Sequence, residues 1–157
     1  MNVFGLYNWN TNTAMKVDWP AAYAGLASEK TYVGFDFWGN RFVPAFGGRL
    51  KFDVPADDCR IIAVRAFDGT KPVVVSSSRH VASPAFEVSD ERWDAATKTL
   101  SGVSTVVPGE AYELRIAVPT GLTCVSAGEG TVAQAGGELR IVFRPQSERL
   151  VWSVRFR

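Results

Sequence analysis

Apolar residues alternate with polar residues over many short segments of this chain, and Gly, Pro, Asn and Asp separate the segments. Such alternation places every second side chain on one face of a strand, and it is typical of half-buried antiparallel sheets. The spacing of three and four residues that marks an amphipathic helix is almost absent. The sequence therefore predicts an all-β fold, and within that class an antiparallel β-sandwich.

The C-terminal segment shows the alternation most clearly. One face of this segment is apolar and consists of Leu150, Trp152, Val154 and Phe156. The other face is polar and consists of Ser153, Arg155 and Arg157. Residues 139–143 alternate in the same way, and the Pro-containing turn at 145–148 joins the two segments. We expect them to pair as a β-hairpin.

Further strands are expected at residues 3–9, 14–17, 31–37, 50–54, 59–64 and 112–118. The run 59–64 is apolar on both faces, so we expect it in the middle of a sheet. Residues 20–25 include three alanines and predict one helical turn. Turn-forming residues cluster at 67–72, which indicates a joint between two small β units packed in tandem, residues 1–67 and 68–157.

Charge and hydropathy restrict the partners of the chain. Its 157 residues carry a net charge of +1, and the basic residues are scattered instead of forming a stripe. We therefore expect neither nucleic acid nor a membrane as a partner, and no apolar run approaches the roughly 20 residues that cross a bilayer. The start lacks the features of a signal peptide and opens on a strand-like segment, as a domain cut from a longer polypeptide would.

Two cysteines, Cys59 and Cys124, stand 65 positions apart. Both lie in or beside apolar runs, so we expect small buried hydrophobic side chains. A disulfide between them is the alternative. Neither has a second ligand at zinc-site spacing, so no metal and no cofactor are expected.

Residues 1–67 resemble the C-terminal β-sandwich behind the catalytic barrel of α-galactosidase-type (melibiase-like) glycoside hydrolases. The segments that carry this resemblance are residues 7–10, 32–38 and 50–64. They match an opening Asn-Trp strand, an aromatic-Asp-x-Trp strand and a Pro-bearing turn before the closing strand. The second unit is similar to the extra tail of some bacterial members, through residues 77–80, 93–94, 100–102 and 108–115.

The resemblance implies a role without catalysis. The catalytic carboxylates of the family lie in its (β/α) barrel, which requires at least about 200 residues. No catalytic residue can be carried over to this chain, and the expected partner is the barrel of a parent polypeptide. We therefore expect a non-catalytic C-terminal accessory domain of a glycoside hydrolase. The alternative is an autonomous carbohydrate-binding module.

Few polar residues are candidates for chemistry. His80 is the single histidine, and a catalytic triad of His80, a serine at 76–78 and a distant carboxylate is one interpretation. A structural role for Arg79 and His80 at the joint between the units is the stronger interpretation. Most acidic residues fall at turns, where we expect them to bind the local backbone.

Asp36 is the exception among the acids, because it lies between Phe35 and Phe37. If buried, it needs a cationic partner. The candidates are Arg41, Arg49 and Arg60.

The five tryptophans suggest a sugar-binding site, since an exposed indole can stack on the apolar face of a sugar ring. Trp38, Asn40 and Arg41 form the best candidate set, because they end a strand and enter a turn. Packing of the tryptophans in the core is the alternative interpretation.

Overall fold

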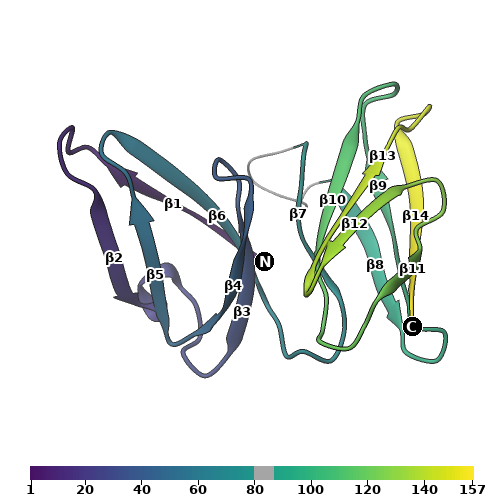
Figure 1. Ribbon diagram of the computed structural model, residues 1–157, viewed down its shortest axis with the longest axis horizontal. Coiled ribbons are helices and arrows are strands. Elements are labelled where there is room, and N and C mark those ends of the chain that lie inside the picture. The colour runs from purple at the N-terminus through teal and green to yellow at the C-terminus, as the bar shows by residue number, and fades with distance from the viewer. Residues whose placement is uncertain (80–86) are drawn as a thin grey trace. The chain divides into compact units, whose positions relative to one another are not determined.

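The computed structural model describes residues 1–79 and 87–157, and its regular structure is all-β apart from a single 3₁₀ turn (Figure 1). Every strand pairing within it is antiparallel. The chain divides into two compact units, which we call unit 1 (Met1–Asp68) and unit 2 (Gly69–Arg157). The division falls inside the turn-rich segment that the sequence marks as a joint.

Unit 1 contains two sheets. Its elements are β1 (Asn2–Asn8), β2 (Met15–Pro20), the 3₁₀ turn η1 (Ala21–Ala24), β3 (Thr31–Asp36), β4 (Arg41–Gly47), β5 (Arg49–Val54) and β6 (Asp58–Ala66). One sheet has the order β1-β6-β3-β4, and β2 and β5 form the other. The interior position of β6 confirms the prediction from its two apolar faces, and η1 confirms the predicted helical turn.

The core of unit 1 lies between these two sheets. Leu50 of β5 packs with Ile62 and Val64 of β6, while Val54 of β5 packs with Leu6 of β1. The inward residues of each strand are two positions apart, as the alternation requires. The two-stranded sheet therefore covers one face of the four-stranded sheet.

Unit 2 is a sandwich of two four-stranded sheets. Its strands are β7 (Val73–Ser77), β8 (Val88–Asp94), β9 (Thr99–Thr105), β10 (Tyr112–Ala117), β11 (Cys124–Ser126), β12 (Thr131–Ala135), β13 (Glu138–Phe143) and β14 (Arg149–Phe156). The sheet orders are β12-β13-β10-β7 and β11-β14-β9-β8. Both sheets contribute to one continuous core, with Leu114 and Ile141 from the first and Leu100 and Val154 from the second.

The predicted hairpin between residues 139–143 and the C-terminal strand is wrong. β13 pairs with β10 and β12, whereas β14 pairs with β9 and β11 in the opposite sheet. Residues 144–148 therefore form an arch that crosses the core. The alternation identified the inward side chains correctly, but inward faces are satisfied equally well by two strands that face each other across a sandwich.

Cys59 and Cys124 are free thiols and only partly buried, whereas the sequence predicted small buried side chains. Cys59 lies near the start of β6 and Cys124 on the short edge strand β11, so neither has strand neighbours on all sides. Burial still raises the pKa of the Cys124 thiol above its usual value.

Candidate functional site

Exposed aromatic side chains gather at one end of the four-stranded sheet in unit 1. The strand registers bring the ends of β1 and β3 together with the starts of β6 and β4. Tyr7, Trp9 and Trp38 are exposed there by 53%, 83% and 54%. We call Tyr7, Trp9, Phe37 and Trp38 the aromatic end.

Tyr7 and Trp9 form a stacked pair at the end of β1. They are two residues apart and so share one face, and their rings lie 5.9 Å apart with planes only 9° from parallel. The Tyr7 ring lies over Gly5, where a Cβ would be 2.7 Å from Tyr7 Cε2. Because Tyr7 supports one side of Trp9 and the indole is 83% exposed, the other indole face is open to solvent.

Asn8 and Asn10 hold the loop that presents Trp9. The buried Asn8 amide donates to the carbonyl oxygens of Thr13 and Pro55, each over 2.9 Å, and its Oδ1 accepts from the backbone N–H of Asn10. Asn10 Oδ1 in turn accepts from the N–H groups of Asn12 and Thr13. These bonds fix the backbone on both sides of Trp9.

The turn from β3 to β4 presents Trp38. The Asn40 N–H donates to the Phe37 carbonyl over 3.2 Å, and Asn40 adopts the left-handed region at φ 46°. Position 39 requires glycine, since a Cβ there would lie 2.3 Å from Asp36 Oδ2. Trp38 packs edge-on against Phe37, with ring centroids 5.1 Å apart.

Asp36 is the anchor of this turn. Its side chain is buried, and Oδ1 accepts from the Gly39 N–H over 3.0 Å. Oδ2 lies 3.3 Å from Arg41 Nε and 3.5 Å from Arg60 Nε. Two of the three predicted partners are thus beside it, while Arg49 instead pairs with Asp18 at 2.7 Å.

Arg41 is held by Asp36 but remains open to solvent. Its side chain is 61% exposed, so the guanidinium nitrogens that do not face Asp36 can donate to a ligand. The structure therefore places Trp38, Asn40 and Arg41 at one turn, as residues of one exposed surface. Open ring faces beside fixed N–H donors are suited to a ligand with an apolar face and hydroxyl groups.

The serines near the joint are engaged in structural contacts. The Ser77 hydroxyl donates to the Glu87 carboxylate, and Ser78 Oγ accepts from the Glu113 N–H over 2.9 Å. Arg79 Nη1 donates to the Thr105 carbonyl over 2.9 Å, a contact within unit 2, so the role predicted for Arg79 at the joint stays a prediction. His80 lies outside the described residues.

Two of the turn acids bind the local backbone as expected. Asp58 Oδ1 accepts from the Cys59 N–H over 2.7 Å, and Asp94 Oδ1 accepts from those of Ala96 and Thr97. The hydrogen bonds from Thr97 and Ala96 lower the pKa of Asp94. These contacts stabilise turns and do not bring two carboxylates together.

The sequence interpretation missed Tyr7 and Trp9 as site residues. Their signal is that residues 3–9 carry large apolar groups on both faces, with Phe4 and Leu6 on one and Tyr7 and Trp9 on the other. The even-numbered pair packs into the core, and the odd-numbered pair remains at the surface. Of the other tryptophans, Trp152 is buried and Trp93 packs against the same core.

Within residues 1–79 and 87–157, no group of three or more His, Cys, Asp or Glu side chains is placed to hold a metal ion. The same part of the chain has no helix long and apolar enough to cross a membrane.

Comparison with known proteins leaves the resemblance to the α-galactosidase-type sandwich as an expectation, because no family model, curated protein or solved structure matches this chain.

Proposed function

We propose that this chain is a non-catalytic accessory module of a glycoside hydrolase, and that it contacts carbohydrate through the aromatic end. The observation that carries the proposal is the exposure of Trp9 and Trp38 at one end of a sheet whose interior is well packed. Large rings left in water at a rigid site are characteristic of surfaces that are covered by a ligand.

The fixed geometry of the aromatic end favours a sugar ligand. The C–H face of a pyranose ring would stack on the open face of Trp9 or on Trp38, where it replaces water on an apolar surface. Arg41 and Asn40 would then donate to sugar hydroxyls, with Arg41 already oriented by Asp36. Little side-chain freedom is lost on binding, since Tyr7 supports Trp9 and Phe37 contacts Trp38.

Binding to glycans tests this proposal directly. We expect saturable binding of the purified chain to galactosides or plant oligosaccharides, measured by calorimetry and by tryptophan fluorescence. Trp9→Ala and Trp38→Ala should each weaken binding about tenfold, because each removes a stacking surface.

Trp19→Ala is the matched control, since Trp19 is also exposed, by 41%, but lies on β2 in the other sheet. This variant should bind like the unmodified chain. Absence of binding at millimolar ligand, or equal weakening by all three substitutions, would remove the aromatic end as the binding site.

An accessory module and an autonomous carbohydrate-binding module would both bind sugar at the aromatic end. Only the accessory module would be joined to a catalytic barrel in the same polypeptide. The coding sequence that precedes the Met1 codon distinguishes them. In-frame repeats of strand and helix that can form a (β/α) barrel support the accessory module, whereas a stop codon in that frame supports the autonomous one.

A further inference from the structure

Unit 2 contains a surface groove of about 630 Å³ beside β14. One wall is formed by residues 126–129, which include the last residue of β11, and by residues 143–145, which include the last residue of β13 and the start of the arch. The other wall is β14 from Leu150 to Ser153, and Thr99 and Arg155 complete the lining. Phe143 and Trp152, both members of the core, also face the groove.

The backbone of β14 is open along this groove. β14 pairs with β9 over residues 149–155, but on its other side β11 pairs only with Arg155 and Phe156. After Ser126 the chain leaves the sheet, and β12 joins the opposite sheet beside β13. No strand among the described residues therefore pairs with β14 from Arg149 to Ser153 on the groove side.

The register shows which main-chain groups are exposed there. The Phe156 N–H donates to the Lys98 carbonyl and the Val106 N–H to the Glu148 carbonyl, so even-numbered residues of β14 are hydrogen-bonded to β9. The odd-numbered residues Val151 and Ser153 must direct their N–H and C=O groups toward the groove. They form an unoccupied edge of the kind to which another strand can add.

Close packing prevents the chain itself from filling this edge. The turn after β11 has Gly128 at φ 61°, and the Gly130 N–H donates to the Ala127 carbonyl over 3.1 Å. A Cβ at Gly130 would lie 2.4 Å from Ile141 Cγ2, so this backbone packs directly on β13. Residues 127–130 are thus fixed to the opposite sheet and leave the edge of β14 open.

We propose that the edge of β14 binds an extended segment of a partner protein, which adds as a further strand and whose alternate residues are apolar and acidic. Residues opposite Val151 and Ser153 would point outward, and the residues between them would point inward toward Phe143 and Trp152. The inward positions therefore require apolar side chains.

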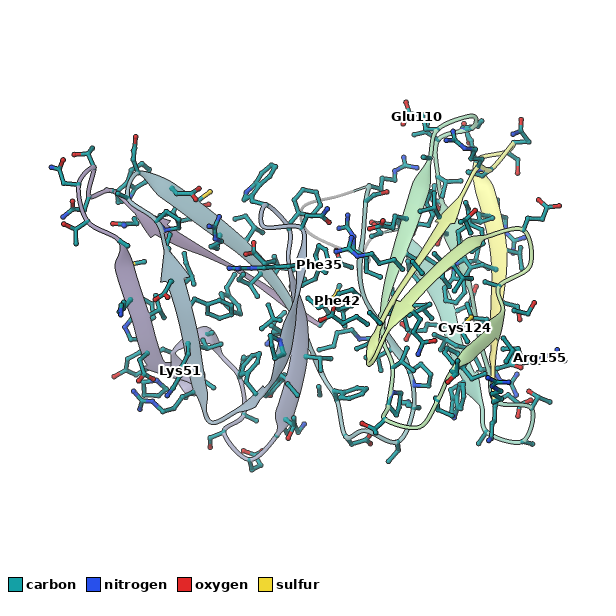
Figure 2. All side chains as sticks on the ribbon, viewed as in Figure 1. Phe35, Phe42, Lys51, Glu110, Cys124 and Arg155 are labelled. Carbon is teal, nitrogen blue, oxygen red and sulfur yellow. The ribbon has the colours of Figure 1, made fainter. Side chains whose placement is uncertain are left out.

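Charge determines the outward positions of the bound segment. Arg144 and Arg155 line the groove with the single acid Glu129, and Arg149 stands at the other end of the open edge. The Arg155 side chain points outward from β14 (Figure 2). No ion pair within residues 1–79 and 87–157 neutralises these three arginines, so acidic side chains complement them.

A single peptide strand fits the groove better than a second copy of this chain does. The wall formed by residues 126–129 lines the groove opposite the edge of β14. If the β14 strands of two copies paired, the wall of each copy would have to avoid a clash with the other copy. A peptide has no such wall. The five positions from Arg149 to Ser153 span about 16 Å, so a segment about seven residues long covers them. Of their groove-facing main-chain groups, the Arg149 carbonyl already accepts from Ser147 Oγ.

A synthetic probe tests the proposal on the full chain. We would use a fluorescein-labelled peptide of alternating Val and Glu, about seven residues long, and measure its anisotropy. Saturable binding is expected, and a peptide of alternating Val and Lys should bind at least about tenfold more weakly. A Val-Glu peptide with N-methylated backbone on its hydrogen-bonding edge should lose binding to a similar extent, because it cannot donate to β14.

Ser153→Pro removes the N–H that faces the groove and leaves the bonds between β14 and β9 in place, as proline is tolerated on an open strand edge. We expect it to weaken the Val-Glu probe about tenfold. Ser153→Ala is the matched control, since it keeps the N–H and should bind normally. The N-methylated probe gives the same information on the unmodified chain if the proline variant does not fold.

Three results would overturn the proposal. The first is that the Val-Glu probe does not bind. The second is that the N-methylated probe binds as tightly as the parent, which would mean that backbone pairing is not involved. The third is a concentration-dependent dimer, seen by light scattering and lost in Ser153→Pro, since the edge would then be occupied by a second copy.

Discussion

The Tyr112 hydroxyl lies inside unit 2, where it donates to Ser104 Oγ over 3.0 Å, and Trp152 Nε1 donates to the same oxygen over 2.9 Å. Tyr112 is only 3% exposed. Burial raises the pKa of Tyr112 to about 12, and the negative charge of Glu87 acts in the same direction. The fold therefore keeps this phenol neutral at a pH where an unfolded tyrosine ionises.

This shift in pKa predicts a loss of stability in alkali. Below pH 10 the phenol is protonated in both states, so its contribution is constant. Between the unfolded pKa of about 10 and the folded pKa of about 12, the unfolded state releases its proton first and is favoured. The free energy of unfolding should fall by about 2 to 3 kcal/mol over that range, measured by urea denaturation at several pH values.

Tyr112→Phe should remove this part of the pH dependence, although it also costs a buried hydrogen bond at every pH. Tyr23→Phe is the matched control, because Tyr23 is 77% exposed. An unchanged alkaline slope in Tyr112→Phe would show that other groups produce the loss of stability.

The candidate site could be predicted from the sequence only in part. Trp38 lies in a turn signalled by Gly39 and Asn40, and turn residues are accessible, so its exposure follows from local pattern. Trp9 also stands beside turn residues, Asn8 and Asn10, but residues 3–9 carry large apolar groups on both faces, so local pattern does not tell which of them is exposed. The exposure of Trp9 depends on which face of β1 the second sheet covers, and that is decided by the long-range packing of Val17 and Val54 against Leu6.

Strands β9 and β14 contact each other closely where Gly102 lies opposite Trp152. A Cβ at Gly102 would be 2.4 Å from Trp152 Cζ2, so the indole lies flat over the glycine. Gly102→Ala should therefore destabilise unit 2 by about 1 to 3 kcal/mol, because the buried indole must move. Chemical denaturation measures the change.

A double-mutant cycle with Trp152→Phe tests the cause. The smaller ring relieves the clash, so Gly102→Ala should cost less in the Trp152→Phe background than in the unmodified chain. Ser101→Ala, at the neighbouring position of β9, is the matched control and should change stability little. Strictly additive effects of the two substitutions would mean that the indole is not the obstacle.

At the level of elements, alternation predicted where strands run but not which strands pair. The pattern predicts strands at residues 139–143, 150–156 and 112–118, and these correspond to β13, β14 and β10. The pairing of β13 with β10 and of β14 with β9 depends on contacts between distant segments. Local pattern contains no information on those contacts. The short Pro-containing link at residues 144–148 is compatible with an arch as well as with a hairpin.

At the scale of the whole chain, each unit has a core of its own, but the two units differ in size and in the construction of that core. Unit 2 has 89 residues and one cluster that joins two four-stranded sheets. Unit 1 has 68 residues, and a sheet of only two strands covers its four-stranded sheet. Small domains bury a lower fraction of their surface and are correspondingly less stable.

We therefore expect the fragment Gly69–Arg157 to fold by itself with a cooperative unfolding transition, and the fragment Met1–Asp68 to be the less stable of the two. Trp93 and Trp152 lie in or against the core of unit 2, so tryptophan fluorescence reports on that core in the fragment, and in a whole chain in which Trp9, Trp19 and Trp38 are replaced by Phe. The midpoint of urea denaturation seen by these two tryptophans should be similar in the two. Because the fragment also retains the edge of β14, it should still bind the Val-Glu probe. A fragment without a sigmoidal transition would mean that the sandwich of unit 2 requires residues 1–68 for its stability.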